Sequence, residues 1–126
     1  MKVCISSKGN SLESVMDPRF GRAAYFIIVD TETMESEVIE NSAAASGGGA
    51  GVTSGQLMAD KEIEAVITGN VGPNAMNVLK ASKVDIYRGT NSSVKENIDE
   101  FKKGLLEQIS KTVPSHYGLG AQEEKK

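Results

Sequence analysis

The fold is decided by residues 17–30, which read Asp17-Pro18-Arg19-Phe20-Gly21-Arg22-Ala23-Ala24-Tyr25-Phe26-Ile27-Ile28-Val29-Asp30. A charged turn that contains glycine runs here without a break into an apolar strand. The strand, expected at 25–29, is apolar at every position, which is typical of a strand buried on both faces of a sheet. The turn places two guanidinium groups just before the first residue of that strand. We therefore expect a buried sheet with a positively charged loop at one edge, placed to meet a ligand.

Short apolar runs on either side of this stretch predict four more strands and three helices. The additional strands are expected at 2–6, 35–40, 64–68 and 84–87. Two helices are expected at about 52–61 and 74–81. The last helix begins after Ser92 or Ser93, either of which can cap it. Its apolar residues follow helical spacing, at Val94, Ile98, Phe101, Leu105 and Ile109.

The order of these elements predicts the topology of the sheet. Short connections join the first three strands, whereas helices precede the fourth and fifth, and such crossovers are right-handed. The most economical sheet is five-stranded and mixed, with order 3-2-1-4-5, strand 2 antiparallel and helices covering the sheet. This is a three-layer α/β/α ribonuclease H-like fold. Residues 1–112 are expected to form one domain, followed by a flexible polar tail at 113–126.

This topology brings four connecting segments to one edge of the sheet. The carboxyl ends of the parallel strands share that edge, and the antiparallel strand starts there. The segments are residues 17–22, 46–51, 69–73 and 88–90. Open α/β sheets bind ligands beyond the carboxyl ends of their strands, where the strand order reverses. We therefore expect a ligand crevice between the first and fourth strands.

The glycine-rich loop can offer backbone N–H groups to an anion. Ser46-Gly47-Gly48-Gly49-Ala50-Gly51 leads into a helix, whose dipole also favours negative charge. No Lys-Ser/Thr pair follows, as it would in a Walker A loop, and Gly55 falls one place late for a dinucleotide fingerprint. The alternative interpretation is a flexible connection whose glycines adopt positive φ angles.

The two arginines of the turn also allow two interpretations. Arg19 and Arg22 can donate hydrogen bonds to an anion or to a metal–sulfur cluster. Alternatively, an ion pair between Asp17 and Arg22 braces a long loop. Cys4 lies in the first strand and is expected to be buried as a small apolar group. His116 is a candidate metal ligand, although no His/Cys spacing in the chain matches a zinc site.

Composition and strand sequences argue against several classes of function. The chain has 14 Lys and Arg against 17 Asp and Glu, a net charge of −3, and so lacks the basic surplus typical of nucleic-acid binding. No apolar run approaches the roughly 18 residues of a membrane span. The absence of a signal-peptide pattern and the single cysteine favour a cytoplasmic protein. Neither the first nor the fourth predicted strand supplies an Asp or Glu inside the sheet, which argues against two-metal nuclease chemistry.

Three stretches together resemble the nitrogenase iron–molybdenum cofactor biosynthesis family, the small domain of dinitrogenase cofactor carriers and their stand-alone relatives. They are Arg19-Phe20-Gly21-Arg22-Ala23-Ala24-Tyr25-Phe26, the glycine-rich loop and Ala65-Val66-Ile67-Thr68-Gly69-Asn70-Val71-Gly72, within a match of about residues 1–110. The resemblance implies the same α/β/α layout and binding of an iron–sulfur or iron–molybdenum–sulfur cluster without catalysis. Some relatives carry histidine where this chain has Ala45 and Ser46, or histidine-rich tails, of which only His116 remains.

We therefore expect a cytoplasmic carrier of an anionic iron–sulfur or iron–molybdenum–sulfur cluster, not an enzyme. The expected cluster-binding residues are Arg19, Arg22, Ser46, Gly47, Gly48, Gly49 and Asn70, with His116 as a candidate metal ligand. The alternative is an interaction module that docks a metal-cluster assembly protein without binding a cofactor itself. Neither nucleic acid nor membrane is an expected partner. A small enzyme acting on a phosphate-bearing metabolite ranks last, because no general base is visible.

Overall fold

The computed structural model describes residues 1–42 and 49–110. Its strands are β1 (Lys2–Ser7), β2 (Tyr25–Asp30), β3 (Ser36–Glu40), β4 (Ala65–Thr68), β5 (Asp85–Arg88) and β6 (Glu107–Ser110). Its helices are α1 (Ala50–Asp60), α2 (Pro73–Ala81) and α3 (Val94–Lys102), with a short 3-10 turn, η1 (Phe20–Arg22), before β2. The predicted glycines and serine at 46–48, the tail at 113–126 and His116 lie outside the described residues.

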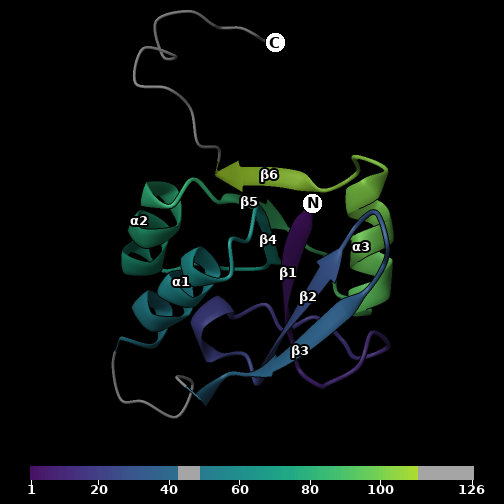
Figure 1. The fold of residues 1–126 in the computed structure, drawn as a ribbon, viewed down its shortest axis with the longest axis horizontal. Helices are drawn as coiled ribbons and strands as arrows, with labels where there is room; N and C mark the ends of the chain where they lie inside the picture. The colour runs from purple at the N-terminus through teal and green to yellow at the C-terminus, as the bar shows by residue number, and fades with distance from the viewer. Residues whose placement is uncertain (43–48, 111–126) are drawn as a thin grey trace, which may run out of the picture.

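The described strands form one mixed sheet in the order β3-β2-β1-β4-β5-β6 (Figure 1). The predicted order of the first five strands and the antiparallel pairing of β2 with β1 are confirmed. The predicted number of strands is wrong, because β6 pairs antiparallel with β5 at the edge of the sheet. Assignment to the ribonuclease H-like class stays a prediction. Among the described helices, none is long and apolar enough to cross a membrane.

The sixth strand arises where the sequence pattern predicts more helix. Helix α3 ends at Lys102, and Gly104 then adopts a positive φ of 74°. A glycine in this left-handed region commonly ends a helix. Leu105 therefore does not continue the apolar face of α3 and is 68% exposed, while Ile109 belongs to β6. Helical spacing alone predicts a helix that is too long, because the spacing of apolar residues does not show that Gly104 ends the helix.

Helices cover both faces of the sheet, as predicted. Helices α1 and α2 pack on one face and α3 on the other, as Figure 1 shows. The first face includes Cys4, Phe26, Val66 and Ile86, and the second includes Val3, Ile5, Ile27 and Ile67. Alternate residues of β1, β2 and β4 thus enter different cores. This explains why the strand at 25–29 is apolar at every position.

Candidate functional site

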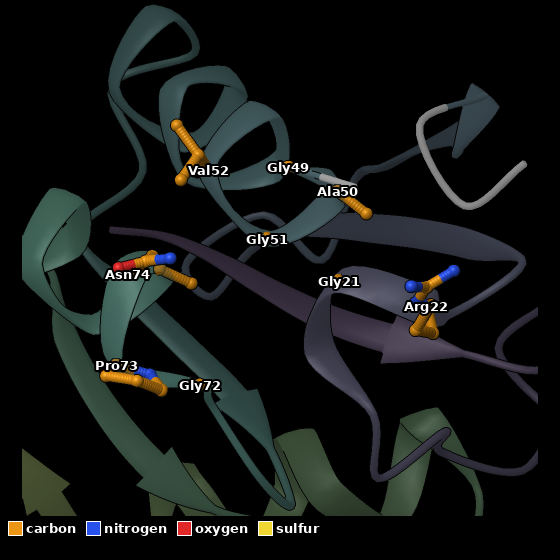
Figure 2. A pocket seen from close by; sticks show the side chains of 10 residues that line it. Gly21, Arg22, Gly49, Ala50, Gly51, Val52, Gly72, Pro73 and Asn74 are labelled. Atoms are coloured by element: carbon orange, nitrogen blue, oxygen red, sulfur yellow. The ribbon is translucent and has the colours of Figure 1, made fainter. Parts of the chain in front are cut away.

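Three segments that are far apart in the sequence line one cleft of about 270 Å³. Its walls are Gly21 and Arg22 of η1, the start of α1 from Gly49 to Val52, and the start of α2 from Gly72 to Ala75. Figure 2 shows Arg22 and Asn74 on opposite sides of this cleft. We call it the helix-start cleft. The structure thus brings together the described parts of the arginine turn, the glycine loop and the segment after β4.

Both helices that border the helix-start cleft begin without a capping side chain. The residues before their first turns are Gly49 for α1 and Gly72 for α2. Helix α3 differs, because the Ser93 hydroxyl accepts from the Glu96 backbone N–H at 3.0 Å and the Glu96 carboxylate accepts from that of Ser93 at 3.1 Å. The first N–H groups of a helix lack partners within it, and the dipole favours negative charge there. Both helix starts at the cleft therefore offer backbone donors, although in α2 the first residue, Pro73, has no N–H and the donors begin at Asn74.

Two glycines allow the walls of the helix-start cleft to approach each other closely. A Cβ added to Gly21 would lie 2.8 Å from the Cα of Gly51, and one added to Gly51 would lie 3.0 Å from the Cβ of Ala75. Real Cβ atoms essentially never come as close as the first distance, and the second is tighter than most real Cβ contacts. These positions therefore set the spacing of η1, α1 and α2.

Helices α1 and α2 approach each other along the same small-residue face. A Cβ added to Gly55 would lie 2.9 Å from a methyl carbon of Val78 on α2. Gly51 and Gly55 are four residues apart, so they share one face of a helix. The sequence pattern alone suggests for Gly51 a role as a loop donor and for Gly55 only a place near a motif. Their spacing is the signal that predicts close helix packing.

The turn before η1 is braced by Asp17 and Arg19, not by the predicted pair of Asp17 and Arg22. The Asp17 carboxylate accepts hydrogen bonds from the Arg19 backbone N–H at 2.9 Å, from Nε at 3.1 Å and from Nη2 at 2.9 Å. Asp17 is buried, while the Arg19 side chain is 65% exposed. Local geometry favours this partner, because an aspartate can readily reach the N–H two residues further along the chain.

The electrostatics of this pair predict how stability depends on pH. Burial alone would raise the pKa of the Asp17 carboxyl, but the hydrogen bonds and charge of Arg19 outweigh it and hold the pKa below its ordinary value. Because the folded pKa is the lower one, the carboxylate stabilises the fold above the unfolded value of about 4. This contribution is lost as the pH falls through the folded pKa.

Asp17→Asn should therefore remove part of the acid sensitivity of this protein. We expect the free energy of unfolding of the variant to fall less steeply than that of the wild type below about pH 4. Urea unfolding at a series of pH values from neutral to strongly acidic measures both slopes. Asp30, whose pKa is also lowered, is present in both proteins, so the difference isolates Asp17. Equal slopes would contradict this assignment.

The loop before η1 occupies the place between β1 and β4 where we expected a ligand. The Ser6 hydroxyl donates to the Asp17 backbone carbonyl at 2.6 Å and hydrogen-bonds with the Thr68 hydroxyl at 2.7 Å. Pro18 packs against Gly69, where an added Cβ would lie 2.6 Å from the Cβ of Pro18. The strand ends are thus covered by the chain itself, and the helix-start cleft lies beside them. Sheet topology does not specify which loop fills the space above the strand ends, and the place of a bound ligand stays a prediction.

The predicted site residues divide between two clefts. Arg22 and Gly49 line the helix-start cleft, whereas Asn70 lines a second cleft and Arg19 lines neither. Ser46, Gly47, Gly48 and His116 lie outside the described residues. Cys4 is fully buried, as predicted, and burial raises the pKa of its thiol. Within the described residues, no three His, Cys, Asp or Glu side chains lie where they could hold a metal ion.

Comparison with known proteins identifies relatives over most of the chain. The family model described as dinitrogenase iron-molybdenum cofactor matches residues 1–104. An uncharacterized protein from Methanocaldococcus jannaschii is 37% identical over 112 residues, which cover 86% of this chain and 92% of that protein.

Solved structures show the same fold. The apo form of the orange protein from Desulfovibrio gigas has a TM-score of 0.83 and 29% identity, covering 90% of this chain and 96% of that one. A Thermotoga protein proposed to be a NifB protein has a TM-score of 0.78 and 41% identity, covering 90% and 97% of the two chains.

Proposed function

Because this chain belongs to the dinitrogenase iron-molybdenum cofactor family, we propose that it carries an anionic iron–sulfur or iron–molybdenum–sulfur cluster without catalysis. The cluster is cargo, received and released in the helix-start cleft. One observation supports this location above the others: two helix N-termini without capping side chains open onto the same cleft, with Arg22 beside them. A partner that delivers or receives the cluster would be a metal-cluster assembly protein.

The donors of the helix-start cleft suit such a cargo. The sulfides of a metal–sulfur cluster accept hydrogen bonds, and hydrogen bonds to sulfur stabilise its negative charge. Backbone N–H groups at Ala50 and Gly51 and the guanidinium of Arg22 are donors of this kind. Arg22, Gly72 and Asn74 are also exposed, so cargo can enter and leave without unfolding of the protein.

A carrier role fits the lining of this cleft better than an enzymatic one. Among the described lining residues, none is a histidine, carboxylate, lysine or other general acid or base. General acid–base catalysis needs such a group within hydrogen-bond reach of the reacting atoms. The solved structure of the orange protein is that of its apo form. We propose that this chain exists with and without a bound cluster.

Arg22→Gln tests the proposed site directly. We expect cluster affinity to fall about tenfold or more, since a hydrogen bond to a charged group contributes about 1.5–3 kcal/mol. The full chain is incubated without oxygen with a cluster donor, and binding is followed by visible absorption and elemental analysis. Lys95→Gln is the matched control, because it removes one exposed positive charge from α3, on the other face of the sheet.

The outcomes separate the proposed carrier from the alternative. Equal losses in Arg22→Gln and Lys95→Gln would show a general charge effect and contradict this site. A wild-type protein that takes up no cluster, yet forms a stable complex with an assembly protein when metal-free, would overturn the carrier and favour the interaction module.

A further inference from the structure

We propose that the second cleft, at the carboxyl ends of β4 and β5, binds a small carboxylate anchored by Arg88. This cleft has a volume of about 270 Å³. Its lining residues are Met16, Pro18, Gly69, Asn70, Arg88, Gly89 and Asn91, so it shares no residue with the helix-start cleft. We call it the Arg88 cleft. The proposal does not depend on cluster binding.

Arg88 is held at the wall of this cleft, and its positive charge has only an exposed carboxylate, that of Glu107, as its ion-pair partner. Its Nη1 donates to the carbonyl oxygen of Gly69 at 3.2 Å, which holds the guanidinium beside the loop after β4. Its Nε lies 3.5 Å from a carboxylate oxygen of Glu107, whose side chain is 73% exposed. Exposed pairs of this kind contribute little stability. A carboxylate on a ligand can therefore replace Glu107 at the guanidinium.

Two amide side chains give the cleft further polar groups. Asn70 and Asn91 line it, and both residues are exposed. Each side chain carries two N–H donors and one carbonyl acceptor, available beside the guanidinium. Met16 and Pro18 form an apolar part of the wall, which suits a short carbon chain. One positive charge, two amides and an apolar wall fit a small organic carboxylate better than a bare inorganic anion.

The walls of the Arg88 cleft are held in place before any ligand binds. The fully buried Asn97 side chain accepts from the Thr90 N–H at 2.8 Å and donates to the carbonyl oxygens of Thr90 at 3.1 Å and Ser93 at 3.0 Å. A Cβ on Gly89 would collide with Sδ of Met16. The loop that carries Asn91 is thus fixed on both sides. Ligand binding to such a preformed site loses little entropy in ordering it.

Isothermal titration of the full chain with succinate at low salt tests this site. We expect binding with a dissociation constant of about 1 mM and a loss of about tenfold or more in Arg88→Gln, as for a bond to a charged group. Glu107→Gln should bind succinate more tightly, because the competing carboxylate is gone. Lys95→Gln, which removes an equal charge elsewhere, should bind like the wild type.

Further titrations distinguish a carboxylate site at Arg88 from a general anion site and from the helix-start cleft. Arg22→Gln should leave succinate binding unchanged, and Arg88→Gln should leave cluster uptake unchanged, so either site can fail alone. Inorganic phosphate is titrated in parallel. Phosphate binding as tight as succinate binding, with the same dependence on Arg88, would overturn the carboxylate assignment. An unchanged affinity in Arg88→Gln, or no succinate binding at about 10 mM, would overturn the site itself.

Discussion

Phe20→Ala should lower the free energy of unfolding by about 3–5 kcal/mol, the cost of removing a large buried aromatic side chain. Phe20 belongs to η1 and is only 1% exposed. Its ring centroid lies 5.4 Å from that of Phe26 on β2, within the core that α1 and α2 cover. Truncation removes this contact and leaves a cavity. Chemical denaturation followed by circular dichroism measures the loss.

The control for this truncation is Leu105→Ala. Leu105 is 68% exposed, and we expect its removal to change the free energy of unfolding by less than about 0.5 kcal/mol. A loss below about 1 kcal/mol in Phe20→Ala would mean that η1 is not anchored in the core as described. Because Arg22 follows in the same turn, Phe20→Ala should also weaken binding in the helix-start cleft.

Gly21→Ala should destabilise the protein by about 1–3 kcal/mol, the usual cost of overpacking a tight contact. The added Cβ would lie 2.8 Å from the Cα of Gly51, and a backbone atom cannot rotate away as a side chain can. Relief of the clash must separate η1 from α1. We therefore expect cluster uptake in the helix-start cleft to fall with stability. Denaturant unfolding and anaerobic reconstitution measure the two effects.

Gly72→Ala is the matched control for the stability part of this experiment. An added Cβ at Gly72 would meet no atom within 4 Å, and its φ of −69° is open to any residue. Its free energy of unfolding should change by less than about 0.5 kcal/mol. If Gly21→Ala costs no more than Gly72→Ala, the close approach of η1 and α1 does not hold the cleft together.

Much of the fold could be predicted because buried strands have a simple chemical signature. Residues 25–29 are apolar at every position, and in the structure Phe26 and Ile28 enter one core while Ile27 and Val29 enter the other. The connection lengths then restrict the sheet to few orders, which gave the correct sequence of the first five strands. The meeting of the arginine turn with the starts of α1 and α2 followed from that order.

The sixth strand, the partner of Asp17 and the position of the clefts depend on local contacts that the spacing of apolar and charged residues does not reveal. The sixth strand follows from the left-handed conformation of Gly104, which apolar spacing ignores. The partner of Asp17 is set by local turn geometry, and charge alone does not distinguish Arg19 from Arg22. The place between β1 and β4 is filled by the loop that contains Pro18. The position of a cleft beside a sheet depends on such details of loop packing.

The uncapped starts of α1 and α2 also bear on how this protein tolerates mutation. A donor that belongs to the main chain is present whichever amino acid is encoded there, proline excepted. Sequence drift at Val52 or Asn74 therefore changes the shape and polarity of the rim but preserves the N–H groups of these two residues. Selection should act most strongly on Gly21 and Gly51, because a methyl group at Gly21 forces η1 and α1 apart and one at Gly51 crowds Ala75 of α2.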